Sequence, residues 1–126
     1  MASLVFDAGA LIALDRGDRK LGALLALTAR DGHEAITSAA CVAQAWRNPA
    51  RQARLTRALG GILERPLDEI AARRCGLLLA QSETSDVVDG ALALVVQSGD
   101  TVLTSDPDDL ARLLNASNVD ARIRVV

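Results

Sequence analysis

Carboxylates dominate the side chains that could do chemistry in this chain. Asp7 closes the apolar run LVF, Asp89 lies in SDVVDGALALV, and Asp106 and Asp109 lie in TVLTSDPDDL. Asp86 lies one helical turn before Asp89, on the same face of the expected helix. Several carboxylates that converge without a lysine would repel one another unless a divalent cation held them. Oxygen-only ligands favour Mg²⁺ or Mn²⁺, and the chemistry of such a site is metal-assisted phosphodiester hydrolysis.

Each of these acids also has a structural explanation. Asp is favoured at helix N-caps and first turns, where it satisfies free amides and meets the positive end of the helix dipole. Asp7 could cap the helix that follows it, Asp86 the helix that begins near residue 87, and Asp106 the helix that begins at Pro107. For any single Asp, capping is the commoner role, so the metal site depends on the whole set.

A regular alternation of strands and helices would position the acids. Strands are expected at 4–7, 33–37, 62–66, 101–106 and 121–126, with helices at 8–14, 21–31, 38–46, 49–60, 67–80, 87–96 and 107–114. This order predicts an α/β fold with three layers, α/β/α, around a central, mainly parallel sheet of four to five strands, in one domain spanning residues 1–126. Helices that follow strands begin at the carboxyl edge of such a sheet, so all five acids are expected along that edge.

Composition excludes several classes of function. Of the 126 residues, half are hydrophobic, only 2% are aromatic, and the net charge is -2, which weighs against modules that stack bases on aromatic side chains. His33 is the only histidine, and Cys41 and Cys75 are isolated, so we expect buried free thiols and no zinc site. We also expect no signal peptide, no membrane-spanning segment and a cytoplasmic location.

Arginines form a second candidate feature. They are spaced four, three and three residues apart, at Arg47, Arg51, Arg54 and Arg57. The last three would align on one side of a helix. Such a stripe is either a solvated face or a surface where Arg47, Arg51 and Arg54 bind RNA phosphates beside the acids. Two polar residues are expected to support the acids: Thr104 could hydrogen-bond a carboxylate, and Ser38 could cap its helix.

Taken together, these motifs resemble those of a known family. LVFDAGALIAL, TSAACVAQAWR, SDVVDGALALV and TVLTSDPDDL are similar, in order and spacing, to the motifs of PIN-domain ribonucleases, above all the VapC toxins of VapBC toxin–antitoxin pairs. The resemblance implies a Mg²⁺- or Mn²⁺-dependent endoribonuclease that cleaves structured RNA, such as tRNA or rRNA. It implies Asp7, Asp89 and Asp106 as catalytic metal ligands and Asp109 as a further ligand. Asp86 is a secondary candidate, because it shares a helix face with Asp89.

Gln44 departs from this pattern, because most of the family would have Glu there. An amide oxygen can ligate a metal or orient its water but adds no negative charge, so Asp86 or Asp109 would have to compensate. The resemblance also implies a cognate VapB-type antitoxin as partner, a homodimer, and a heterotetramer or larger assembly with that antitoxin. Gln44 favours one alternative, a catalytically degenerate PIN-like module that only engages a protein partner.

Overall fold

A five-stranded parallel sheet forms the centre of the computed structural model, which describes residues 2–126. The strand order is β3-β2-β1-β4-β5, and every neighbouring pair is parallel. The strands are β1 (Leu4–Phe6), β2 (Ala35–Ser38), β3 (Leu63–Arg65), β4 (Thr101–Thr104) and β5 (Arg122–Val125). The expected α/β fold class is therefore confirmed, and the sheet has the larger of the two expected strand numbers.

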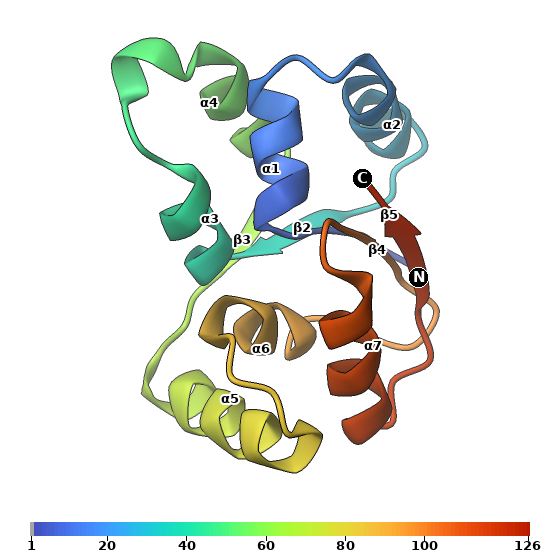
Figure 1. Ribbon diagram of the computed structural model, residues 1–126. Coiled ribbons are helices and arrows are strands. Elements are labelled where there is room, and N and C mark those ends of the chain that lie inside the picture. Colours follow the sequence, from blue (N-terminus) through green and yellow to red (C-terminus); the bar gives the residue numbers. More distant parts are fainter. Residues whose placement is uncertain (1) are drawn as a thin grey trace.

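Helices cover both faces of this sheet (Figure 1). One face carries α1 (Ala8–Asp15), α2 (Arg19–Arg30) and α4 (Ala53–Leu59), and the other carries α5 (Glu69–Ser82), α6 (Val87–Ala93) and α7 (Pro107–Ala116). The short helix α3 (Ala39–Ala45) packs against both α1 and α6. Within residues 2–126, no helix has both the length and the apolar character that crossing a membrane requires.

The strand order brings two of the acids to the same place. β1 and β4 are neighbours at the centre of the sheet, but the chain leaves β1 through helices on one face and leaves β4 through α7 on the other. In open parallel sheets, this reversal of direction opens a crevice at the carboxyl ends of the two strands. Asp7 directly follows β1, and Asp106 comes two residues after β4, so both lie at the crevice.

Aliphatic side chains build the core that supports this crevice. The two central strands are apolar on both faces, as strands between two helix layers must be, and Val5, Phe6 and Val102 are fully buried. The largest buried side chains of the helices come from both layers: Leu11, Leu55, Leu92, Leu110 and Leu113. Truncating one such leucine to alanine typically costs about 2–5 kcal/mol, so the central strands provide a rigid base for the site.

The helix expected from residue 49 to residue 60 is divided. Pro49–Arg51 forms a single 3-10 turn, and α4 begins only at Ala53. The backbone of Gln52 (φ −118°, ψ 43°) is not helical, which separates the two segments. Arg51 and Arg54 therefore lie on different elements and do not form one stripe.

The side chain of Gln52 explains this break. Its amide oxygen accepts hydrogen bonds from the backbone N–H groups of Arg47 and Asn48, at 2.8 and 2.9 Å. Its amide nitrogen donates to Oδ2 of Asp15 at 3.1 Å and to the carbonyl of Ala45 at 2.9 Å. The buried amide of Gln52 thus anchors the segment between α3 and α4 against the end of α1. These hydrogen bonds require a backbone conformation at Gln52 that is not helical.

Candidate metal centre

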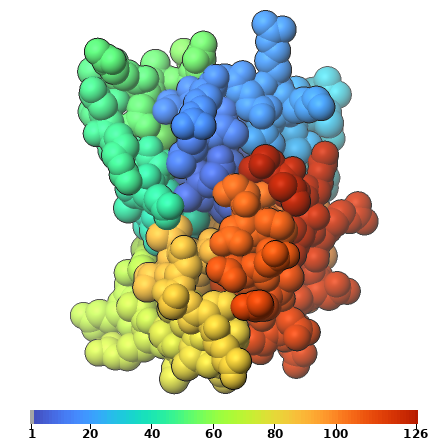
Figure 2. Space-filling model, viewed as in Figure 1, coloured from blue at the N-terminus to red at the C-terminus, as the bar shows by residue number. Residues whose placement is uncertain are grey.

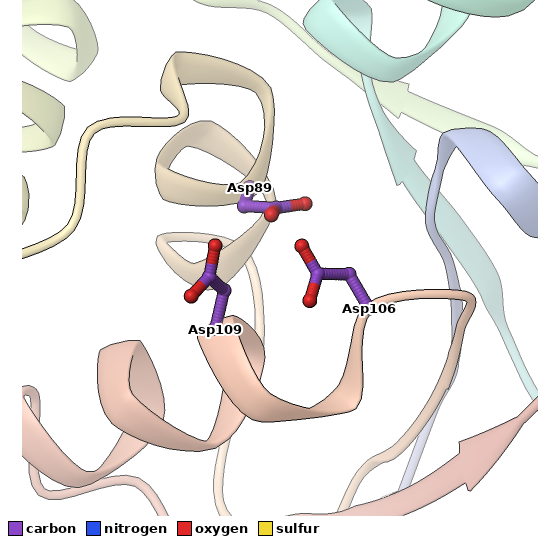
Figure 3. A group of neighbouring side chains, drawn as sticks. All are labelled: Asp89, Asp106 and Asp109. Atoms are coloured by element: carbon purple, nitrogen blue, oxygen red, sulfur yellow. The ribbon is translucent and has the colours of Figure 1, made fainter.

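Three carboxylates converge where α6 faces the start of α7 (Figure 3). Asp89 belongs to α6, Asp106 occupies the N-cap position of α7, and Asp109 lies in the first turn of α7. One oxygen from each lies within 4.8 Å of the others, a spacing that a single cation could bridge. The donors are all hard carboxylate oxygens, so the set fits Mg²⁺ or Mn²⁺ and does not fit a metal that prefers sulfur or imidazole.

Asp89 is the carboxylate whose environment most needs a cation. Its side chain is 8% exposed, and its Oδ2 atom is buried without a hydrogen-bond partner among the described residues. Burial, together with the charges of Asp86 and Asp106, raises the pKa of Asp89 to about 7. A buried oxygen that lacks a donor and faces like charges is costly unless a cation balances it. These features are therefore consistent with a metal site.

Asp106 occupies a capping position, but its side chain makes no capping hydrogen bond. The carboxylate points toward Asp89 and Asp109 instead (Figure 3). Thr104, fully buried at the end of β4, accepts the backbone N–H of Asp106 through Oγ1 at 2.9 Å. Thr104 therefore holds the backbone of Asp106, whereas we expected it to bond a carboxylate. The strand expected at 101–106 ends at Thr104 because this hydrogen bond turns the chain.

Asp7 ties the start of α1 to the loop between β4 and α7. Its Oδ1 accepts the N–H of Ala10 at 2.7 Å, which caps α1, and its Oδ2 accepts the N–H of Ser105 at 2.9 Å. Asp7 is buried, and its charge contributes to the raised pKa of Asp89. Each oxygen keeps a further lone pair, so metal ligation by Asp7 stays a prediction. Its visible contribution is to hold the loop that carries Asp106.

Asp86 and Ser38 both cap helices at this edge of the sheet. Asp86 accepts the backbone N–H of Asp89 at 3.0 Å and so orients the first turn of α6. Ser38 accepts the backbone N–H of Ala40 at 3.2 Å at the start of α3. The secondary role of Asp86 as a metal ligand stays a prediction.

Two side chains of α3 have different environments. Cys41 is buried, and burial followed by the charge of Asp7 raises the pKa of Cys41 to about 12, so its thiol is protonated at neutral pH. Gln44 is exposed and lines a hollow together with Arg47 and Arg51. Ligation of the metal by Gln44 stays a prediction.

The four arginines divide between two hollows. Arg47 and Arg51 line a hollow of about 510 Å³ beside the end of α1. Arg54 and Arg57 line another, of about 520 Å³, between α2 and α4. This division follows from the break at Gln52. Contact between these arginines and RNA stays a prediction.

Sequence reasoning missed Gly9 and Ser105. The N–H of Ser105 holds Asp7, and a Cβ atom at Gly9 would lie 2.6 Å from the Cβ of Ser105. Only glycine therefore allows the loop to approach α1 this closely. A glycine inside an expected helix is a usable signal, because it costs about 1 kcal/mol relative to alanine. Ser105 acts through its backbone, so its residue type carried no signal.

Comparisons with known proteins identify solved structures that share this fold. No family model matches the chain, and no curated protein matches it. A chain in the crystal structure of VapBC2 from Rickettsia felis, bound to a DNA fragment from their promoter, has a TM-score of 0.64 at 12% identity, covering 96% of this chain and 98% of that chain.

Two structures from the FitAB system are similar as well. A chain in the crystal structure of FitAcB from Neisseria gonorrhoeae has a TM-score of 0.58 at 20% identity, covering 94% of this chain and 96% of that chain. A chain in the structure of FitAB bound to an IR36 DNA fragment has a TM-score of 0.59 at 19% identity, covering 95% and 94%. At these identities the likeness establishes the fold alone.

The sequence-based assignment to PIN-domain VapC toxins is corrected by these findings. The similar chains come from structures named as VapBC2 and FitAB assemblies, and the shared fold does not single out this chain as a toxin. The implied function, a toxin ribonuclease neutralised by a VapB-type antitoxin, went beyond the fold and is corrected with it. The alternative of a degenerate module depended on the same family assignment and falls with it.

Proposed function

We propose that this chain is a divalent-cation-dependent hydrolase of phosphodiester bonds in nucleic acid. The observation that carries the proposal is the convergence of the carboxylates of Asp89, Asp106 and Asp109. Among the described residues, Oδ2 of Asp89 is also buried without a hydrogen-bond partner. Capping explains Asp7 and Asp86, but it does not explain why Asp106 leaves its own helix uncapped and faces two other acids. A bound Mg²⁺ or Mn²⁺ would remove the repulsion within this group.

The acids of the site would have different roles. Asp89, Asp106 and Asp109 would hold the cation through their carboxylates. Asp7 fixes the loop that carries Asp106 and adds negative charge, and Asp86 orients the turn that carries Asp89. When bound, a divalent cation supplies Lewis-acid stabilisation of the phosphate charge and lowers the pKa of water.

The side chains near the site also disfavour covalent catalysis. The site lacks a lysine and a histidine, and both thiols of the chain, Cys41 and Cys75, are buried, with pKa values raised by that burial, so a covalent route through these nucleophiles is disfavoured. A carboxylate cluster with direct water attack on phosphorus is the chemistry that remains.

A metal titration joined to an activity assay tests the proposal. Mn²⁺ binding would be measured by calorimetry, and hydrolysis would be followed with bis(p-nitrophenyl) phosphate and with total RNA. Asp106→Asn should weaken Mn²⁺ binding and abolish both hydrolyses, yet fold normally because the Asp106 side chain caps nothing. Asp108→Asn is the matched control, since Asp108 is an exposed acid of the same helical turn outside the cluster. Equal effects of the two variants would contradict the proposal.

The proposal extends to partners. The similar solved structures are named as VapBC2 and FitAB assemblies, so we propose that this chain also binds a protein partner. We further propose that its substrate is RNA and that it forms a homodimer. Light scattering on the purified chain should give about twice its mass of 13.2 kDa. A monomer at all concentrations would contradict the homodimer.

A further inference from the structure

We propose that the hollow beside the end of α1 binds the phosphates of a nucleic-acid strand whose scissile bond lies at the carboxylate cluster. We call it the arginine hollow; it is lined by Arg16, Gln44, Arg47, Asn48 and Arg51, with Asp15 and Gln52 beneath them. The inference rests on the proposed function, because it supplies the substrate contacts that an acidic centre cannot make for itself. A polyanion needs local positive charge to approach a cluster of carboxylates.

The charge of the arginine hollow suits a phosphate chain. Its three arginines come from three segments: Arg16 follows α1, Arg47 follows α3, and Arg51 ends the 3-10 turn. The one carboxylate in the lining, Asp15, has its Oδ2 engaged by the amide of Gln52. Three positive charges against one negative charge leave the hollow positive. Arginine is also the side chain best suited to phosphate, because its planar fork can donate two parallel hydrogen bonds.

Part of the arginine hollow is already ordered. The guanidinium of Arg47 donates through one nitrogen to the carbonyls of Ala43 and Trp46, at 2.9 and 2.7 Å. Guanidinium has five N–H donors, so others are left for a ligand. Asn48 uses its Oδ1 to accept the N–H of Ala50, which leaves its amide nitrogen as a further donor. Donors that are held in place lose less entropy when they bind a phosphate.

The arginine hollow lies on a route to the acids. Arg16 and Ile12 also line the neighbouring hollow on the other flank of α1, together with Gly9 and Ser105. Figure 2 shows α1 (blue) between the segment from α3 to α4 (green) and the start of α7 with the C-terminus (orange and red). Arg16 comes nine residues after Asp7, so it lies about 14 Å along the helix from the crevice at 1.5 Å per residue. A strand lying along α1 could therefore reach both places.

The second arginine hollow of the chain lacks these properties and provides a control. Arg54 and Arg57 stand at a hollow whose lining is mostly apolar or small, with Leu25, Ala26 and Ala58 among its residues. An apolar lining does not suit a charged phosphate chain. We therefore leave Arg54 out of the nucleic-acid contacts, although the sequence spacing had included it.

Binding of labelled oligonucleotides tests the inference. Fluorescence anisotropy in EDTA, which prevents cleavage, would follow a single-stranded RNA and a DNA of the same mixed sequence over a range of salt. Arg16→Gln with Arg51→Gln should weaken binding about tenfold and lower the salt slope by about 1.4, since each lost single-strand phosphate contact contributes about 0.7. Arg54→Gln with Arg57→Gln makes the same change in net charge at exposed residues and should leave both quantities nearly unchanged.

Three results would overturn the inference. Equal losses in the two double variants would mean that only net charge matters. A loss confined to RNA would mean that the ribose hydroxyl is recognised and not the phosphate that RNA and DNA share. Absence of binding by the unchanged protein would remove the subsite altogether.

Hydrolysis of bis(p-nitrophenyl) phosphate separates this inference from the proposed function. The small diester has no extended backbone, so its hydrolysis reports on the metal centre and not on the arginine hollow. If that ester is cleaved but both double variants bind nucleic acid normally, the subsite fails and the metal centre stands. If the binding pattern holds but no preparation cleaves the ester with Mn²⁺, the metal centre fails and the subsite stands.

Discussion

Asp89 should make the metal-free protein less stable as the pH rises from about 4 to about 7. Its pKa is raised from 3.8 to about 7 in the folded protein, chiefly by burial and then by neighbouring carboxylates. Between those values the folded state holds a proton that the unfolded state has released. Unfolding therefore releases that proton, and the free energy of unfolding decreases with pH throughout this window.

The size of the effect follows from the same shift. A difference of about 3 pH units at about 1.4 kcal/mol per unit corresponds to roughly 4 kcal/mol by pH 8. Below about pH 4, Asp89 is protonated in both states and contributes no such penalty. Asp89→Asn removes the ionisation but leaves a polar group buried, so roughly 4 kcal/mol is an upper figure for the stability that it restores.

Urea denaturation in EDTA at several pH values would measure this effect. The informative quantity is the difference in unfolding free energy between Asp89→Asn and the unchanged protein, because every other titratable group is present in both proteins. We expect a difference near zero at about pH 4 that grows to a few kcal/mol in favour of the variant at about pH 8. Asp108→Asn should show no such growth. A difference for Asp89→Asn that stays constant with pH would refute the reasoning.

Added Mn²⁺ should reverse the order of stability of the unchanged protein and Asp89→Asn. Mn²⁺ should stabilise the unchanged protein at about pH 8, because a ligand that binds only the folded state raises its stability by mass action. It should stabilise Asp89→Asn much less, since that variant lacks one of the three converging carboxylates. If Mn²⁺ stabilised both proteins equally, Asp89 would not be a ligand.

Three further substitutions test the supports of the site. Gly9→Ala should destabilise the protein by about 1–3 kcal/mol through its clash with Ser105, and Ser105→Gly in the same chain should restore part of the loss, both measured by urea denaturation. Thr104→Val should cost about 1–3 kcal/mol and weaken Mn²⁺ binding by calorimetry, because the N–H of Asp106 loses its acceptor. Gln52→Leu should lower the free energy of unfolding by a similar amount, measured by thermal denaturation. It should leave Mn²⁺ affinity unchanged, because the hydrogen bonds of Gln52 hold the segment between α3 and α4 and not the metal centre.

The fold class could be predicted from the sequence because the same patterns of strand and helix recur along the chain. Apolar runs such as LVF and TVLT alternate with helical spacing along the whole chain, and such alternation has few topological solutions. The position of Asp7 and Asp106 at one crevice followed from the same rule, because both closely follow central strands of a parallel sheet. Local features that depend on one side chain were not accessible in this way.

Gln52 is the clearest of these features. A glutamine between Arg51 and Ala53 fits a helix as well as any polar residue does. What breaks the helix is a set of hydrogen bonds that includes Asp15, which lies 37 residues away in the sequence. The division of the arginines between two hollows depends on that break. Sequence spacing alone therefore grouped Arg54 with Arg51, although the structure separates them.

The acids show why capping and metal binding are hard to separate from sequence. Both roles place Asp at the start of a helix, so one residue pattern predicts either outcome. The structure distinguishes them by the direction of the side chain: Asp7 and Asp86 turn back to a backbone N–H, while Asp106 turns away from its helix toward Asp89. An acid that makes no capping hydrogen bond and instead faces a buried acid loses that hydrogen bond and incurs repulsion. That cost in free energy is what makes Asp106, and not the better-satisfied Asp7, the most informative residue of the site.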